Sequence, residues 1–334
     1  MIMADSFEIA YLYAKVCGAF SNMYLGAKGA ALARESSLAS IWKIYFENEL
    51  PDKGEAWILS TLERKVVERS MERFVMLAGP FTETDRFMAA LVAKHETTAI
   101  KRFLYKLAAG EAKPEHAYFD SPATRKALAA WPRLSDMFAD GPYQWIDAAS
   151  LENLGLAENR LDRQYYRNLW DSVASLPKNR RGNIPTLVLK DIRYQNLAWA
   201  LRIRAYYGYT RDMAGPLLVA LEDADATTLA LGTFDLDIGN LRSFDEWPGR
   251  KLLERQPGPG LDLPLLENAL QKDQFASTRR SLHLYPFGYT PLYCYFAMLE
   301  AEAAVILGIL EGIRLKAPEQ EKIDLAWALA GENV

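Results

Sequence analysis

A helical pattern occurs three times along the chain, and each copy has a glycine near its C-terminal end. The clearest copy covers residues 184–210, and a longer one covers residues 289–316. Apolar residues three and four positions apart are typical of a helix that buries one face, so the pattern predicts long, packed helices. In chain order, the three copies run to Gly110, Gly208 and Gly312.

The spacing of these glycines predicts the domain organisation. A distance of 98 residues separates the first from the second, and 104 separate the second from the third. Because 334 residues exceed the usual size of one domain, we expect three similar helical units at residues 1–112, 113–212 and 213–334. No stretch alternates apolar and polar residues between Asn-Gly or Asp-Gly turns, as strands would require. The predicted fold class is therefore all-α.

Capping residues and helix breakers predict the element boundaries. Asp5, three residues before Glu8, predicts the cap of a first helix, which Gly26 and Gly29 would end. Residues 212–231 read as one helical stretch, followed by the longest irregular segment from Phe234 to Gly260. Further helices are expected at residues 55–77, 84–109, 124–138, 161–173, 184–210 and 265–276, and after Thr290-Pro291.

The last of these helices carries a strict apolar seam. Its members follow one another at alternating steps of four and three residues, as in helices that bury one face against other helices. Full burial of one large member stabilises a fold by roughly 1.5–3 kcal/mol, so we expect this helix to pack in the core. The members are Leu292, Phe296, Leu299, Ala303, Ile306, Leu310 and Ile313.

Charge and cysteine content exclude several classes of protein. The chain has 39 Lys and Arg against 43 Asp and Glu, and its basic residues are scattered, which argues against a nucleic-acid partner. Cys17 and Cys294 lie in apolar helical patterns without a C-x-x-C partner, which favours core thiols in a reducing compartment. The N-terminal segment has no basic region followed by an apolar run, so we expect a cytoplasmic protein without a signal peptide.

The run AAVILGIL resembles a membrane segment when it is viewed in isolation. It contains only the eight residues between Glu302 and Glu311, whereas a membrane-spanning helix needs about 20 mostly apolar residues. We therefore expect a core helix and no membrane span.

Residue types capable of catalysis or metal binding occur without a recognised spacing. None of His95, His116 and His283 belongs to an H-E-x-x-H or E-x-x-H pattern. We interpret His95 as a helix-surface or interface residue and the other two histidines as loop residues. The phosphate-binding pattern G-x-x-x-x-G-K-[ST] and the hydrolase pattern G-x-S-x-G are absent. The sequence therefore predicts no catalytic, cofactor-binding or metal-binding residue and no small-molecule substrate.

Three further groups of polar residues have a structural interpretation. Residues 235–246 match positions one, three and twelve of a calcium loop, but the sixth position lacks the glycine that the sharp turn needs. Glu300 and Glu302 are two residues apart and point to different sides of their helix, so we expect one to pair with a base from a neighbouring helix. Residues 178–181 read as a solvated basic loop, with contact to an acidic partner as the alternative.

Four segments together resemble the C subunit of the V-type and A-type rotary ATPases, whose eukaryotic counterpart is termed the d subunit. The resemblance reaches all three thirds of the chain, in order. The segments are residues 11–16 (YLYAKV), LDRQYYRNLW from Leu161, the pair Asn196 and Arg202, and PLYCYFAMLEAEAAVILGIL from Pro291. At the position of Asn196, the first and third copies of the repeated pattern carry Ala99 and Val305.

This resemblance implies a funnel-shaped body of three similar helical domains around a pseudo-threefold axis. The body would lie on the cytoplasmic face of the membrane rotor ring and receive the foot of the central shaft, so that these would be its partners. It would couple torque to ion transport without being an enzyme and without a cofactor. Two alternatives stay open. One is a helical adaptor or scaffold of another complex, and the other is an all-α enzyme with a carboxylate-bound metal, for which Asp223 and Asp225 are the only helical candidates.

Overall fold

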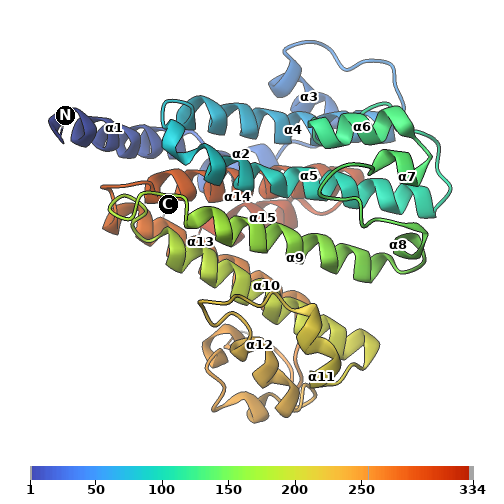
Figure 1. The fold of residues 1–334 in the computed structure, drawn as a ribbon. Coiled ribbons are helices and arrows are strands. Elements are labelled where there is room, and N and C mark those ends of the chain that lie inside the picture. Colours follow the sequence, from blue (N-terminus) through green and yellow to red (C-terminus); the bar gives the residue numbers. More distant parts are fainter. Residues whose placement is uncertain (1, 255, 331–334) are drawn as a thin grey trace. The chain divides into compact units, whose positions relative to one another are not determined.

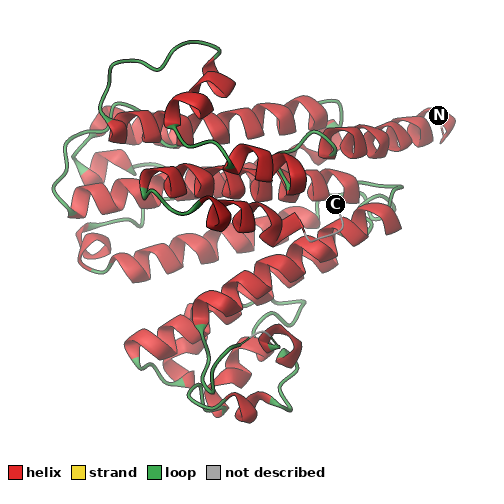
Figure 2. Ribbon diagram, turned by 180° about the vertical axis from the view of Figure 1, so that it is seen from behind, coloured by secondary structure: helices red, strands yellow, loops and turns green. Residues whose placement is uncertain are grey.

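The computed structural model describes residues 2–254 and 256–330 of the chain, and all of its regular structure in these ranges is helical (Figure 2). No strand occurs in either range, which confirms the all-α prediction. The α-helices are α1 (Ile2–Phe20), α2 (Gly26–Ala33), α3 (Leu38–Phe46), α4 (Glu55–Ala78), α5 (Asp85–Ala108), α6 (Pro122–Ala130), α7 (Leu134–Met137), α8 (Ala148–Glu152), α9 (Leu154–Val173), α10 (Ile184–Tyr207), α11 (Arg211–Ala214), α12 (Thr228–Leu231), α13 (Leu263–Leu284), α14 (Thr290–Arg314) and α15 (Glu319–Ala330). The short 3-10 helices are η1 (Thr82–Thr84), η2 (Gly215–Leu217), η3 (Gly232–Asp235), η4 (Leu241–Phe244) and η5 (Arg250–Leu253).

The chain folds into two compact units, each assembled from segments that are distant in sequence. The first unit combines residues 1–13 with residues 166–294, and the second combines residues 14–165 with residues 295–334. The boundaries between the units fall inside α1, α9 and α14. The three consecutive units at 1–112, 113–212 and 213–334, and their pseudo-threefold funnel, stay predictions about internal repetition.

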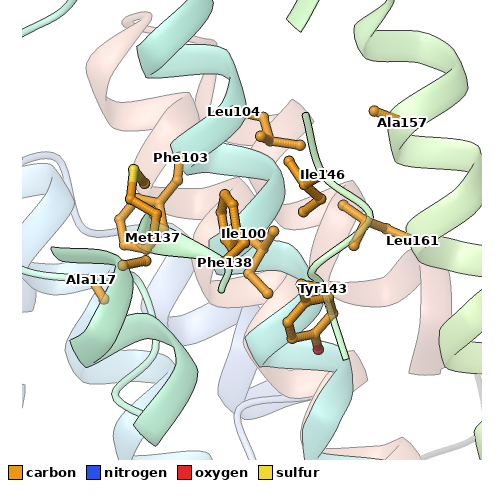
Figure 3. Packing of buried hydrophobic residues seen from close by; sticks show 11 residues of the cluster. Ile100, Phe103, Leu104, Ala117, Met137, Phe138, Tyr143, Ile146, Ala157 and Leu161 are labelled. Atoms are coloured by element: carbon orange, nitrogen blue, oxygen red, sulfur yellow. The ribbon is translucent and has the colours of Figure 1, made fainter. Parts of the chain in front are cut away.

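In the second unit, the long helices α4 and α5 run beside each other (Figure 1). One face of α5 contributes Ile100, Phe103 and Leu104 to a hydrophobic cluster that also includes Met137 and Leu161 (Figure 3). Elsewhere in this unit, α15 packs closely on α2. Burial of these apolar faces stabilises helices that would be marginal in isolation.

In the first unit, α10 and α13 pack side by side, and the irregular segment between them folds over their apolar residues (Figure 1). Leu197 and Leu201 of α10 meet Phe244 and Trp247 of this segment, and Leu266 of α13 completes the contact. In its described residues, 208–254 and 256–262, the segment contains only α11, α12 and short 3-10 helices, so it is held by this cluster rather than by long helices of its own.

Two boundary predictions near the N-terminus were wrong. Helix α1 begins at Ile2, so Asp5 lies within the helix instead of capping it. The helix ends at Phe20, before Gly26, because the side chains of Ser21 and Asn22 both donate to the carbonyl of Gly18 and compete with further helical bonds. Gly26 and Gly29 belong to the next helix, α2.

The helical stretch predicted at residues 212–231 is interrupted. Helix α11 ends at Ala214, a short 3-10 helix follows, and α12 begins only at Thr228. Between them, the carbonyls of Val219 and Ala226 bond to the side chain of Asn196 instead of to a helix. Asp223 and Asp225 therefore lie in a loop. The metal-enzyme alternative required them to lie on a helix.

The three glycines of the repeated pattern differ in role. Gly110 and Gly208 have φ angles of 66° and 63°, a left-handed conformation that ends a helix and favours glycine. Gly312 instead lies inside α14, which continues to Arg314, and a Cβ at this position would lie 2.8 Å from Lys322 Cγ of α15. Its role is close helix packing, so the third copy of the pattern does not end at its glycine, in contrast to the first two.

The apolar seam of α14 is confirmed as a core feature. Leu292 and Leu299 are fully buried, and Leu310 is 1% exposed. Ile313 at the end of the seam is half-buried. Residues outside the seam, such as Val305 and Ile309, are buried as well, so α14 is enclosed on more than one face.

Candidate functional site

Two carboxylates on α14, Glu300 and Glu302, pair with basic groups of neighbouring helices in the second unit. The side chain of Glu302 is 2% exposed. Its Oε1 accepts a hydrogen bond from the backbone N–H of Tyr24 at 2.8 Å, and its Oε2 lies 2.5 Å from Nη1 of Arg73 on α4. A buried carboxylate is tolerated only when its charge and its lone pairs are satisfied, and both conditions are met here.

Glu300 makes the corresponding contacts with α5. Its Oε2 lies 2.8 Å from Lys94 Nζ, and its Oε1 lies 2.8 Å from His95 Nε2. Burial by itself would raise the pKa of Glu300, but Lys94 and His95 outweigh that effect and hold the pKa below its ordinary value. Glu300 is therefore a carboxylate anion at neutral pH.

Of the two interpretations of His95, the helix-surface one was wrong, because the residue lies buried at the interface between α5 and α14. The residue is 6% exposed and packs against Phe119 and Phe296, with ring centroids 5.6 and 6.4 Å away. The apolar pattern of α5 places its ring in the core, and Glu300 provides a polar partner there. A histidine in this position helps to hold α5 against α14.

The two carboxylates contact different helices, as their spacing predicted. Glu300 contacts α5, whereas Glu302 contacts α4 and the segment before α2, so both pair with a neighbouring element. From the sequence we expected a basic partner for one of them. Each carboxylate faces basic groups rather than the other carboxylate, so the arrangement joins three helical elements and does not share a proton as a catalytic dyad does.

Asn196 of α10 is the buried polar centre of the first unit. The residue is 1% exposed, and its Nδ2 donates to the carbonyls of Val219 and Ala226 at 2.9 and 2.8 Å. Its Oδ1 accepts from the N–H of Val219 at 2.7 Å. The amide thus holds the loop between η2 and α12 against α10, which explains why an amide occurs on an otherwise apolar helical face.

Charged side chains also join α10 to α13 in the first unit. Arg202 binds Glu267 through two parallel hydrogen bonds of 2.6 Å each. Lys190 and Tyr194 both bond to Asp273, and although burial would raise the pKa of that carboxyl, their hydrogen bonds lower it overall. Paired hydrogen bonds of this kind fix the rotation of one helix against the other.

The partners of these buried polar groups could not be identified from the sequence. Arg73, Lys94 and Asp273 carry no motif that distinguishes them from other surface charges. The available signal was a polar residue on an apolar helical face, which applies to Asn196, Glu300 and Glu302. That signal indicates burial, whereas the identity of each partner depends on helix packing.

The prediction that the other two histidines lie in loops is confirmed for one of them and wrong for the other. His116 lies in the loop between α5 and α6 and is exposed, which confirms its interpretation. His283 lies in the last turn of α13, so its interpretation was wrong. Within the first unit, the Nδ1 atom of His283 lies 3.0 Å from the hydroxyl of Tyr13.

Residues considered for metal or thiol chemistry have structural contacts. Asp235 pairs with Arg211 at 2.7 Å, and Asp237 accepts from the N–H of Gly239, so both take part in loop structure. Within residues 2–254 and 256–330, no group of three or more His, Cys, Asp or Glu side chains could hold a metal ion. Cys294 is a buried free thiol whose pKa is raised by burial, whereas Cys17 is only half-buried.

Exposed apolar side chains mark the surfaces that a partner could cover. In the first unit, Tyr206 and Tyr207 at the end of α10 are 71% and 59% exposed, with Met213 shortly after them at 52%. Leu284 and Phe287, at the end of α13 and in the loop after it, are exposed by 64% and 78%. Side chains of this size are depleted on free surfaces and enriched in protein interfaces.

The basic loop at residues 178–181 is less solvated than expected. Arg180 and Arg181 are half-buried, and the guanidinium of Arg180 donates to the hydroxyl of Tyr289 at 3.2 Å. Lys178 is exposed. The loop is therefore a packed part of the first unit with one face open.

Among the described residues, no helix combines the length and the apolar character needed to cross a bilayer.

Comparison with known proteins identifies related sequences. The sequence profile of a family described as ATP synthase (C/AC39) subunit matches residues 46–323, which is most of the chain. An uncharacterized protein of Treponema pallidum (strain Nichols) is 22% identical over 320 residues, which cover 91% of this chain and 92% of that protein. The similarity therefore extends through both compact units.

Proposed function

Because this chain belongs to the ATP synthase (C/AC39) subunit family, we propose that it is the central-stalk component that couples the shaft of a V/A-type rotary ATPase to the membrane rotor ring. It would lie on the cytoplasmic face of the membrane and bind the foot of the shaft on one side and the ring on the other. In this role it transmits torque for ion transport and carries out no chemical step itself. The match over residues 46–323 is the observation that carries this proposal.

The packing of the chain supports a mechanical role. A coupler has to transmit force without yielding, and α14 is held to α4 and α5 by the ion pairs of Glu302 and Glu300 as well as by its apolar seam. In the first unit, Arg202 and Asp273 connect α10 with α13 in a similar way. Close-packed interiors have low compressibility and transmit strain, so these units suit torque transfer.

The proposal is tested by capture of partners from native membranes. We expect the tagged chain, extracted in a mild detergent, to bring along a rotor-ring subunit and at least one shaft subunit. The variants Tyr206→Glu and Tyr207→Glu place a charge on the exposed apolar end of α10. The matched control is Lys113→Glu, at an exposed position of the loop after α5. Loss of one partner in the tyrosine variants, with an unchanged thermal midpoint, would assign that surface.

The second candidate function is a helical adaptor or scaffold of another complex. The helical fold and exposed aromatic side chains suit this role equally well, and the identity of the captured proteins separates the two. Capture of a reproducible complex without any ring or shaft subunit would favour the adaptor and contradict the rotary coupler.

A further inference from the structure

Two loops of the first unit are bonded into one surface. One loop covers residues 174–183, between α9 and α10, and the other covers residues 285–289, between α13 and α14. The two loops lie together in Figure 1. The N–H of Tyr289 donates to the carbonyl of Arg180 at 2.6 Å. The N–H and the side chain of Asn183 donate at 2.9 Å to the hydroxyls of Thr290 and Ser281, respectively.

Glycine makes this close contact possible. Gly288 has a φ angle of 141°, a backbone conformation that residues with a side chain rarely adopt. A Cβ at this position would lie 2.4 Å from the carbonyl oxygen of Arg180. The side chains that the two loops carry are therefore presented together from a defined backbone. We use the name two-loop surface for Lys178, Arg181 and Phe287 of these loops together with Arg280 and Leu284 near the C-terminal end of α13, which leads into the second loop.

The two-loop surface exposes large apolar side chains. Leu284 ends α13 and is 64% exposed, and Phe287 lies in the following loop and is 78% exposed. Each side chain exposes apolar area to water, and removal of this area from water would favour binding. Because most of each side chain is open, both project from the surface.

The same surface is rich in positive charge. The chain segments 172–190 and 274–299 contain no Asp or Glu, while Lys178, Arg181 and Arg280 lie within them. Lys178 and Arg280 are exposed, and Arg181 is half-buried. Asp273, the acid that precedes the second segment, is hydrogen-bonded by Lys190 and Tyr194 and also interacts electrostatically with Arg280. Its single negative charge is therefore shared between Lys190 and Arg280, and the surface keeps an excess of positive charge.

We infer that the two-loop surface binds an anionic lipid bilayer directly. Clustered Lys and Arg attract lipid phosphates, while exposed Leu and Phe side chains insert at the boundary between headgroups and acyl chains. Lys and Arg also have long stems that can lie along apolar surface while their charge stays in water. An acidic protein would match the charge but would need a shaped cavity for Phe287, whereas a fluid bilayer accommodates it.

This contact goes beyond the proposed coupling role, because it is made with lipid and not with the ring or the shaft. The positive charge and the apolar side chains would act together: the charge brings the surface to the bilayer, and insertion holds it there. Binding should therefore need both anionic lipid and Phe287, and it should weaken as salt screens the charges.

Sedimentation of the full-length chain with lipid vesicles tests the inference. We expect the protein to sediment with vesicles of phosphatidylcholine mixed with phosphatidylglycerol, and not with phosphatidylcholine alone. Lys178→Gln or Arg280→Gln should each weaken binding about fivefold, and Phe287→Ser should weaken it at least as much. Lys113→Gln and Met76→Ser are matched controls at an exposed lysine and at a 77% exposed apolar residue, and they should bind like the parent chain.

Several results would overturn the inference. They are equal sedimentation with neutral and anionic vesicles, unchanged binding of the Lys178, Arg280 and Phe287 variants, and binding to soluble polyglutamate without binding to vesicles. A Phe287→Trp variant gives a second readout, because its fluorescence should shift to shorter wavelength with anionic vesicles only. Variants that lose vesicle binding but still capture ring and shaft subunits would separate this contact from the coupling role, and capture of neither would contradict that role alone.

Discussion

Arg73 of α4 and Glu302 of α14 form an ion pair in which the carboxylate is almost fully buried while the guanidinium remains 28% exposed. The 229 positions that separate them in sequence make this a tertiary contact, and Glu302 also accepts the N–H of Tyr24. The pair therefore joins α4, α14 and the segment before α2. Loss of either partner would leave the other without its counter-charge.

Replacement of Glu302 by glutamine should destabilise the second unit. The amide retains an acceptor for the N–H of Tyr24 but removes the negative charge that faces Arg73. We expect the free energy of unfolding to fall by about 2 kcal/mol, because Arg73 is partly solvated and the loss is smaller than for a fully buried pair. Urea unfolding measures this. Glu311→Gln, at the exposed pair with Arg314, should leave the midpoint unchanged; an equal effect at both positions would contradict the structural role.

Protonation of Glu300 should make stability depend on pH. A carboxyl group with a lowered pKa binds fewer protons in the folded state than in the unfolded state. Its stabilising contribution is complete above its ordinary pKa of about 4.3 and is lost as the pH falls below that value. The thermal midpoint should therefore drop as the solution is acidified from about pH 5.

The matching variant is Glu300→Gln, which removes this titration. It should melt at a lower temperature than the parent at neutral pH and show a shallower loss between about pH 5 and pH 3. Glu319→Gln, at an exposed position of α15, is the control and should follow the parent curve. Parallel curves for the Glu300 variant and the parent would show that Glu300 contributes nothing to the acid sensitivity.

Removal of the Asn196 side chain should open the loop between η2 and α12. Asn196→Ala would leave the carbonyls of Val219 and Ala226 and the N–H of Val219 without the amide that bonds them. We expect a loss of about 3 kcal/mol, since each buried unsatisfied group costs roughly 1–3 kcal/mol and water can reach part of the site. Limited proteolysis within residues 218–227 should become faster. Gln195→Ala, on the half-buried neighbouring position, should not change the cleavage rate.

A charge in the seam of α14 should prevent normal folding. Leu310 is 1% exposed, so Leu310→Asp buries an unpaired carboxylate and leaves a cavity, with an expected loss of more than about 4 kcal/mol. The protein should aggregate or melt far below the parent, as followed by expression yield and circular dichroism. Ala304→Asp adds the same charge at an exposed position of the same helix and should be tolerated. Normal melting of the Leu310 variant would show that the helix is exposed.

Much of the secondary structure could be predicted from local sequence. The apolar periodicity of α4, α5 and α10 is enough to place these helices, because burial of one face at a period of 3.6 residues is a local property. The prediction failed where side chains compete with helical hydrogen bonds. Ser21 and Asn22 end α1 early. Asn196 binds the carbonyls of residues 219 and 226, which follow it by 23 and 30 positions, so these carbonyls do not take part in a helix.

The sequence by itself determined the all-α class, the seam of α14 and, through four weak segments in a specific order, the family. Tertiary structure alone decided that His95 is buried against Glu300, that Glu302 meets Arg73, and that residues 178–181 pack beside residues 285–289. The physical reason is range. Helical periodicity and capping act over a few neighbouring residues, whereas partners of buried charges and paired loops are chosen by which helices pack together, and that choice depends on the whole chain at once.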